Sequence, residues 1–144
     1  MPLTQSPASV SLDRGLRTMI IVGGVLNLLF ALFHLLLPWL FRWRENLQPL
    51  TPNNRAIMYT FHWVIIFLLL AFSYLTIAQT SRLVGTFLGR FVLFMIGTVW
   101  LIRSTTEVFV FRIGVEGAVW RLALFLTIAA LFLFPALRSS HRTG

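Results

Sequence analysis

The chain has 144 residues, of which 58% are hydrophobic and only 11% are charged, and its mean hydropathy is +0.84. Because a soluble domain normally carries about a quarter charged residues, this composition excludes an ordinary soluble protein and predicts an integral membrane protein. The net charge of +8 comes from arginines that stand mostly at the ends of apolar runs, where they predict headgroup anchors rather than a nucleic-acid-binding surface. The absence of cysteine excludes disulfides, thiolate sites and iron–sulfur clusters.

The first two apolar runs predict membrane-spanning helices at about 16–41 and 53–78. The second run begins well for a helix, because Thr51 can cap its N-terminus and Pro52 suits the first helical position. The linker at 42–54 carries a tryptophan among its charges, which is typical of a segment at the headgroup level.

The third run, at about 83–111, is the least regular of the four. Its uncharged core, 91–102, is only twelve residues long. A bilayer crossing needs roughly twenty residues, so Arg103 and Glu107 must lie inside the membrane or at its edge. The stretch 108–111 alternates β-branched and aromatic residues, so a broken or re-entrant helix stays open as an alternative here. The fourth span is expected at about 116–137.

These spans predict an all-α membrane protein with a single domain, 1–144, whose four transmembrane helices form an antiparallel up-down-up-down bundle. The connection at 79–82 is so short that we expect the third span to return beside the second. Every span carries a seam of polar or small residues at helical spacing, and such seams meet where helices touch in lipid. Four side chains on these seams are candidates for hydrogen bonds between helices: Asn27, Ser73, Thr76 and Thr127.

The expected location follows from the topology and from the basic residues. Four spans place both termini on one side of the membrane, and the arginines near the spans slightly favour the cytoplasm for that side. Arginine without lysine is typical of a GC-rich bacterial gene. The runs 38–43 and 54–57 resemble those of small bacterial four-span proteins, which implies no particular chemistry. We therefore expect a multi-pass protein of a bacterial inner membrane.

Two histidines stand at matched depths in the first two spans. His34 lies seven residues before Phe41, where the charged linker begins, and His62 lies seven residues after Arg55. At about 1.5 Å per residue, both imidazoles lie roughly 10 Å inside the face opposite the termini. Further ionisable groups gather in the same half of the membrane. Together they predict a polar pocket that opens to this face, lined by His34, His62, Arg103, Glu107, Glu116 and Arg121.

The chemistry of this pocket leaves several interpretations open. Imidazole and carboxylate suit a transition metal ion, which makes His34, His62 and Glu107 a candidate metal site, although one ligand per helix matches no known spacing motif. Haem held by both histidines ranks below a metal ion, because its axial helices must stand farther apart than neighbouring helices do. Arg103 and Glu107, four residues apart, are first interpreted as an ion pair. A proton path through the same two histidines and Glu107 is the remaining alternative.

The function predicted first is that of a non-catalytic accessory or assembly subunit of a membrane complex, because so little of the chain lies outside the apolar runs. No nucleophile constellation, phosphate loop or nucleotide fingerprint is present, which argues against an enzyme. The expected partners are membrane lipids and other membrane subunits or a second copy of the chain. The alternatives are a metal-binding membrane redox protein and a small transporter or proton-conducting oligomer.

Overall fold

Four long helices dominate the computed structural model, which describes residues 7–110 and 117–138, with side chains from Arg14 onward. The long helices are α1 (Pro7–Leu40), α3 (Pro52–Ala78), α5 (Phe87–Phe109) and α6 (Ala118–Arg138), and each contains a stretch long and apolar enough to cross a bilayer. Two short helices, α2 (Trp43–Asn46) and α4 (Thr80–Gly85), lie in the connections. The described residues contain no strand, so the prediction of an all-α chain with four candidate membrane helices is confirmed.

Local sequence signals explain where α3 and α5 begin. Thr51 precedes α3 and its Oγ1 accepts a hydrogen bond from the backbone N–H of Asn54 at 3.3 Å, with Pro52 in the first helical position as expected. Thr86 is extended (φ −126°, ψ 152°), and its Oγ1 accepts a hydrogen bond from the backbone N–H of Gly89 at 2.9 Å. This second cap starts α5 at Phe87, later than the predicted residue 83, because α4 occupies the residues before it.

The helices form two hairpins rather than the closed bundle expected from the sequence. Helix α1 packs mainly on α3, α5 packs mainly on α6, and the two pairs meet chiefly through α1 and α6. The expectation that the third span returns beside the second is therefore wrong in this structure. The physical reason is the inserted helix α4, which packs on α5 and carries the chain away from α3 before α5 begins.

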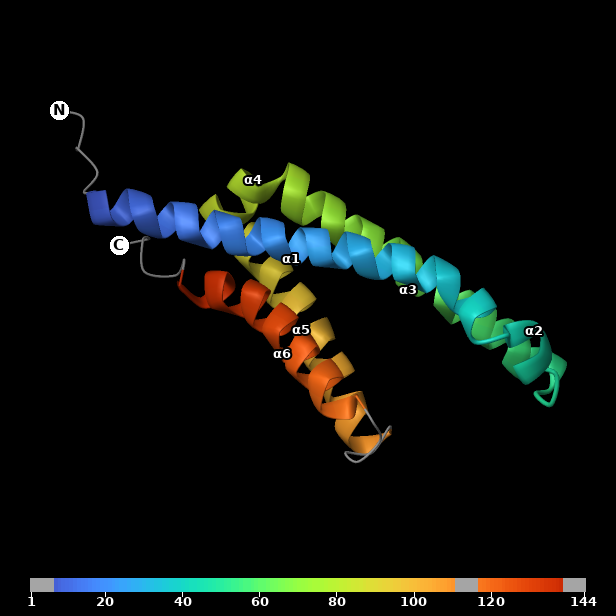
Figure 1. Ribbon diagram of the computed structural model, residues 1–144. Helices are drawn as coiled ribbons and strands as arrows, with labels where there is room; N and C mark the ends of the chain where they lie inside the picture. The colour runs from blue at the N-terminus through green and yellow to red at the C-terminus, as the bar shows by residue number, and fades with distance from the viewer. Residues whose placement is uncertain (1–6, 111–116, 139–144) are drawn as a thin grey trace.

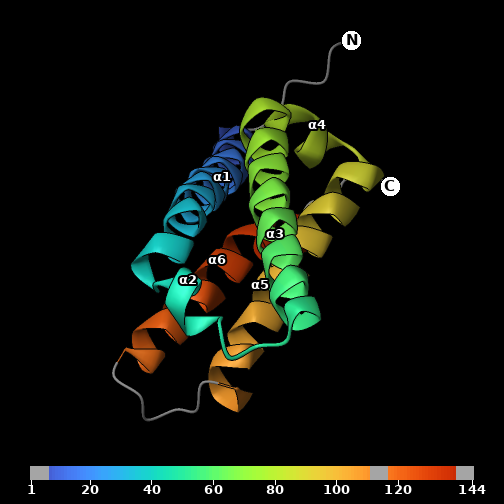
Figure 2. The same ribbon diagram turned by 90° about the vertical axis from the view of Figure 1, so that its right-hand side faces the viewer.

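The hairpins are close together at one end and diverge toward the other (Figure 1). The start of α1, the end of α6 and helix α4 lie at the close end, whereas α2 lies at the far tip of the first hairpin (Figures 1 and 2). The third predicted span does not break inside the membrane-length segment, because α5 is continuous over 23 residues. The expected span at 83–111 is interrupted before this segment, at the extended Thr86, and the last residue of the 108–111 stretch lies outside the described residues.

Two adjacent glycines allow α1 to approach a different helix on each side. A Cβ atom on Gly23 would collide with the Phe132 ring of α6, and one on Gly24 would lie 2.5 Å from Thr76 Oγ1 of α3. Phe132 and Thr76 are both completely buried. Small residues serve this purpose in membrane helices, because close packing replaces the hydrophobic effect as the main attraction between them.

Candidate functional site

The structure brings the two histidines together across the α1–α3 interface. The centroids of the His34 and His62 rings lie 6.2 Å apart, and the ring planes are inclined by 27°. His34 is half-buried and His62 is only 6% exposed. His62 belongs to the buried face of α3 together with Ile66 and Ser73, so the seam identified from the sequence places it against α1. We call His34 and His62 the histidine pair.

A backbone contact defines which nitrogen of His34 carries a proton. Nδ1 of His34 lies 2.8 Å from the carbonyl oxygen of Phe30, one helical turn earlier. A carbonyl oxygen can only accept, so Nδ1–H donates and Nε2 keeps its lone pair while the ring is neutral. This arrangement orients the ring and leaves Nε2 as the nitrogen that can bind a cation or accept a proton.

Helix α2 folds over the far tip of the hairpin and covers His62. The Trp43 ring lies 4.7 Å from the His62 ring at an interplanar angle of 64°. Tyr59 also contacts Trp43, with ring centroids 5.6 Å apart. Such edge-to-face contacts are favourable for aromatic rings, so Trp43 is a specific neighbour of the histidine pair rather than an incidental one.

Arg55 holds the chain segment that carries α2. Its guanidinium donates hydrogen bonds to the backbone carbonyl oxygens of Leu47 at 3.2 Å, Gln48 at 3.0 Å and Leu50 at 3.3 Å. A guanidinium presents several donors in a rigid planar fork, which lets one side chain bind three carbonyls of the short turn at 47–50. Arg55 therefore fixes the position of α2 above the histidine pair.

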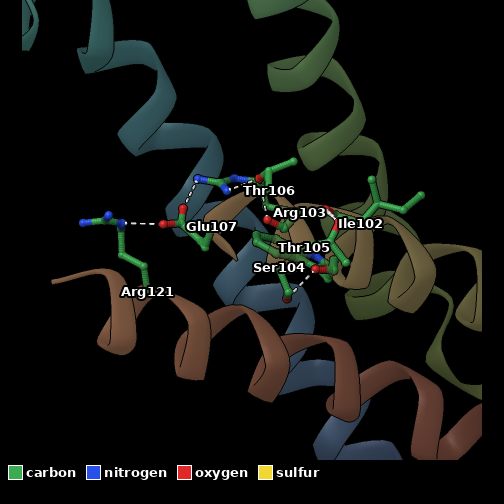
Figure 3. Close-up of polar contacts among 8 residues, drawn as sticks. Ile102, Arg103, Ser104, Thr105, Thr106, Glu107 and Arg121 are labelled. Carbon is green, nitrogen blue, oxygen red and sulfur yellow. Dashed lines mark hydrogen bonds and ion pairs between the residues drawn. The ribbon is translucent and has the colours of Figure 1, made fainter. Parts of the chain in front are cut away.

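The second group of predicted residues lies on the other hairpin. Glu107 of α5 is 1% exposed and forms ion pairs with Arg103 (Nη2 to Oε1, 2.6 Å) and with Arg121 of α6 (Nε to Oε2, 3.0 Å), as Figure 3 shows. Arg103 also donates to Thr106 Oγ1 at 2.6 Å and lies over the Phe125 ring, 4.4 Å from its centroid. We call Arg103, Glu107 and Arg121 the Arg–Glu–Arg cluster.

The expected ion pair between Arg103 and Glu107 is present, and Arg121 adds a partner from the neighbouring helix. A buried carboxylate is costly in an apolar environment unless cations and hydrogen bonds surround it. Two guanidiniums provide this compensation, and because they come from α5 and α6 they also tie these helices together. The geometry is that of a structural connection within the second hairpin.

The single polar pocket predicted from the sequence is divided between the hairpins. The histidine pair belongs to α1 and α3, whereas both carboxylate oxygens of Glu107 face arginines of α5 and α6. Within residues 7–110 and 117–138, no three His, Asp or Glu side chains are close enough to hold a metal ion. The candidate set of His34, His62 and Glu107 is therefore not brought together. The remaining predicted pocket residue, Glu116, lies outside the described residues.

Asn27 makes the hydrogen bond between helices that the sequence suggested, with a partner that the sequence did not identify. The indole N–H of Trp100 on α5 donates to Asn27 Oδ1 at 3.0 Å, and both residues are buried. An indole can only donate, so the oxygen of Asn27 must face it. Phe30 stacks edge-on against Trp100, with ring centroids 5.0 Å apart. This contact joins α1 to the second hairpin.

The other expected interhelical donors behave differently. Thr76 donates to the carbonyl oxygen of Phe72 at 2.6 Å, and Thr127 donates to that of Ala123 at 2.8 Å, so both bond within their own helix. A threonine hydroxyl in a helix reaches the carbonyl one turn earlier, which satisfies it without a second helix. Ser73 is buried at the α1–α3 interface.

No family model, curated protein or solved structure matches this chain. The arrangement of the helices and the two polar clusters are therefore the basis for a function. The Arg–Glu–Arg cluster connects helices, whereas the histidine pair offers an imidazole nitrogen with a lone pair in a largely buried position.

Proposed function

We propose that this protein is an accessory or assembly subunit of a larger membrane complex. That the chain is a small multi-pass membrane protein rests on its four helices of membrane-crossing length and apolarity. The observation that carries the finer proposal is the divergence of the two hairpins (Figure 1). In a closed four-helix bundle α3 and α5 would pack on each other. Here each of them packs mainly on the other member of its own hairpin.

Where the hairpins separate, α5 and α6 carry charged side chains on their surface. Such side chains favour a protein partner over acyl chains alone. Arg103 and Arg121 are 38% and 39% exposed in their side chains although Glu107 between them is buried. Guanidiniums at membrane depth are stabilised by polar groups of neighbouring helices or by headgroups. A partner helix with such groups beside α5 and α6 would add to the contacts that both arginines already make with Glu107.

Site-specific photo-crosslinking in native membranes tests the proposal. A photoreactive residue at Ile102, which is 60% exposed beside Arg103, should capture a distinct membrane protein that mass spectrometry identifies. The matched control is Leu88, 69% exposed near the opposite end of the same helix, which should capture lipid alone. Lipid as the only product at both positions would contradict an accessory role. Crosslinks only to a second copy would replace it with a homo-oligomer.

A further inference from the structure

The end of the molecule where the two hairpins are close together carries a group of arginines. They come from the four elements of this end, α1, α4, α5 and α6, and are Arg14, Arg17, Arg82, Arg90 and Arg138. Helix α4 packs on both α1 and α5, and the start of α1 and the end of α6 lie near it (Figures 1 and 2). Four of these side chains are exposed, and that of Arg90 is half-buried. We call these five arginines the basic face.

The acidic side chains that the structure describes lie away from the basic face. Glu45 belongs to α2 at the far tip of the first hairpin, and Glu107 lies near the other end of α5. Asp13, which precedes the described side chains, is the single acidic residue of the sequence before Glu45 and can offset one positive charge. The basic face therefore keeps an excess of positive charge that attracts anions.

Arginines toward the opposite end are used by the chain itself. Arg55 donates to three backbone carbonyl oxygens, and Arg103 and Arg121 pair with Glu107. These contacts fix the turn before α3 and connect α5 with α6. Positive charge that the protein presents to its surroundings is thus concentrated at the close end of the hairpins.

Apolar side chains lie directly beside the guanidiniums of the basic face. The guanidinium carbon of Arg90 lies 6.0 Å from the centroid of the Phe87 ring, and that of Arg138 lies 5.0 Å from the centroid of the Phe134 ring. Phe87 is 78% exposed, and Leu137, next to Arg138, is 65% exposed. Arginines on such surfaces keep their stems against hydrocarbon and their charged heads at the headgroup level. A ligand that fits this surface combines an anionic group with acyl chains.

From these observations we infer that the basic face binds anionic phospholipids. Their phosphodiester groups pair with the guanidiniums, whose planar fork matches two phosphate oxygens, and their acyl chains cover the exposed apolar side chains. Groups of roughly four to eight basic residues at the ends of membrane helices are typical of surfaces that recognise anionic lipids. A nucleic acid or a free phosphate ion would match the charge but leave the apolar side chains uncovered. The inference is independent of the accessory role, which concerns the surface of α5 and α6 where the hairpins separate.

Native mass spectrometry of the purified full-length protein in mild detergent measures the binding of individual lipids. Phosphatidylglycerol and phosphatidylcholine with the same acyl chains are titrated separately. We expect phosphatidylglycerol to bind more tightly than phosphatidylcholine. A double variant with Arg82→Gln and Arg138→Gln should bind phosphatidylglycerol about 25-fold more weakly, because each arginine near an anionic lipid contributes a factor of about five. Its affinity for phosphatidylcholine should not change.

The matched control removes the same net charge from the far tip of the first hairpin. It combines Arg42→Gln with Arg44→Gln, both of which change exposed side chains at α2, and it should keep most of the affinity for phosphatidylglycerol. A second variant, with Arg82→Lys and Arg138→Lys, retains the positive charge and should also keep most of it. Circular dichroism and size-exclusion elution establish that each variant is folded before its affinity is compared.

The inference is overturned if phosphatidylglycerol binds no more tightly than phosphatidylcholine, or if the two glutamine double variants lose affinity equally. Competition experiments test the source of the anionic group. Displacement of the bound lipid by millimolar inorganic phosphate or by a short oligonucleotide would also overturn the inference, because charge alone would then explain the binding.

Discussion

Replacing Glu107 with glutamine removes the charge on which the second hairpin depends. Glu107 is 1% exposed and faces two guanidiniums at 2.6 and 3.0 Å. Removing one partner of a fully buried ion pair costs about 3–5 kcal/mol. The side chains of Arg103 and Arg121 are 38% and 39% exposed, so the ion pairs are only partly buried and their charges are partly screened. We therefore expect a smaller loss of stability, about 2 kcal/mol, in Glu107→Gln.

Thermal unfolding of the purified protein in detergent, followed by tryptophan fluorescence, measures this loss. A change of that size lowers Tm by roughly 5–10 °C for a chain of this length. Glu45→Gln is the matched control, because Glu45 is exposed on α2, and its substitution should change the free energy of unfolding by less than about 0.5 kcal/mol. An unchanged Tm in Glu107→Gln, or an equal loss in Glu45→Gln, would refute the argument that the buried carboxylate stabilises the hairpin.

Three further predictions concern packing and the α2 segment. Gly24→Ala should lower the free energy of unfolding by about 1–3 kcal/mol, because its new Cβ would lie 2.5 Å from a side-chain oxygen of α3. Gly15→Ala is the control and should not lower it, because nothing lies within 4 Å of its new Cβ. Thermal unfolding of the two variants makes the comparison. Asn27→Leu leaves the buried indole of Trp100 without an acceptor and should cost about 1–3 kcal/mol, and addition of Trp100→Phe should not double that loss in the same assay. Arg55→Ala should speed amide hydrogen exchange at 43–50 while leaving the centre of α3 protected, and uniform exchange across both would contradict its local role.

The positions of the helices could be predicted because they depend on local signals. Apolar length marks the four spans, and the Thr51–Pro52 pair marks the start of α3. The ion pair of Arg103 with Glu107 follows from their spacing of four residues on one helix. In each case the partners lie within one element, so the geometry of a helix is enough.

The choice of partners between helices could not be predicted in the same way. Trp100 and Asn27 are 73 residues apart, and both lie on seams that could have faced several neighbours. In a bilayer an apolar helix face can contact lipid or any other helix equally well. The sequence pattern therefore shows which face of a helix is polar, but not which helix that face packs against. Thr86 has an extended backbone that separates α4 from α5, and the sequence alone did not reveal this interruption.

The divergence of the hairpins gives the protein a wedge-shaped outline in a bilayer. Its helices would displace less lipid in the leaflet where the hairpins meet than in the leaflet where they separate (Figure 1). We therefore expect the lateral pressure of the two leaflets to act unequally on the molecule. In small vesicles, where curvature expands the outer leaflet, the divergent end should insert outward more often than in large flat ones, and protease accessibility of the two ends would measure this preference.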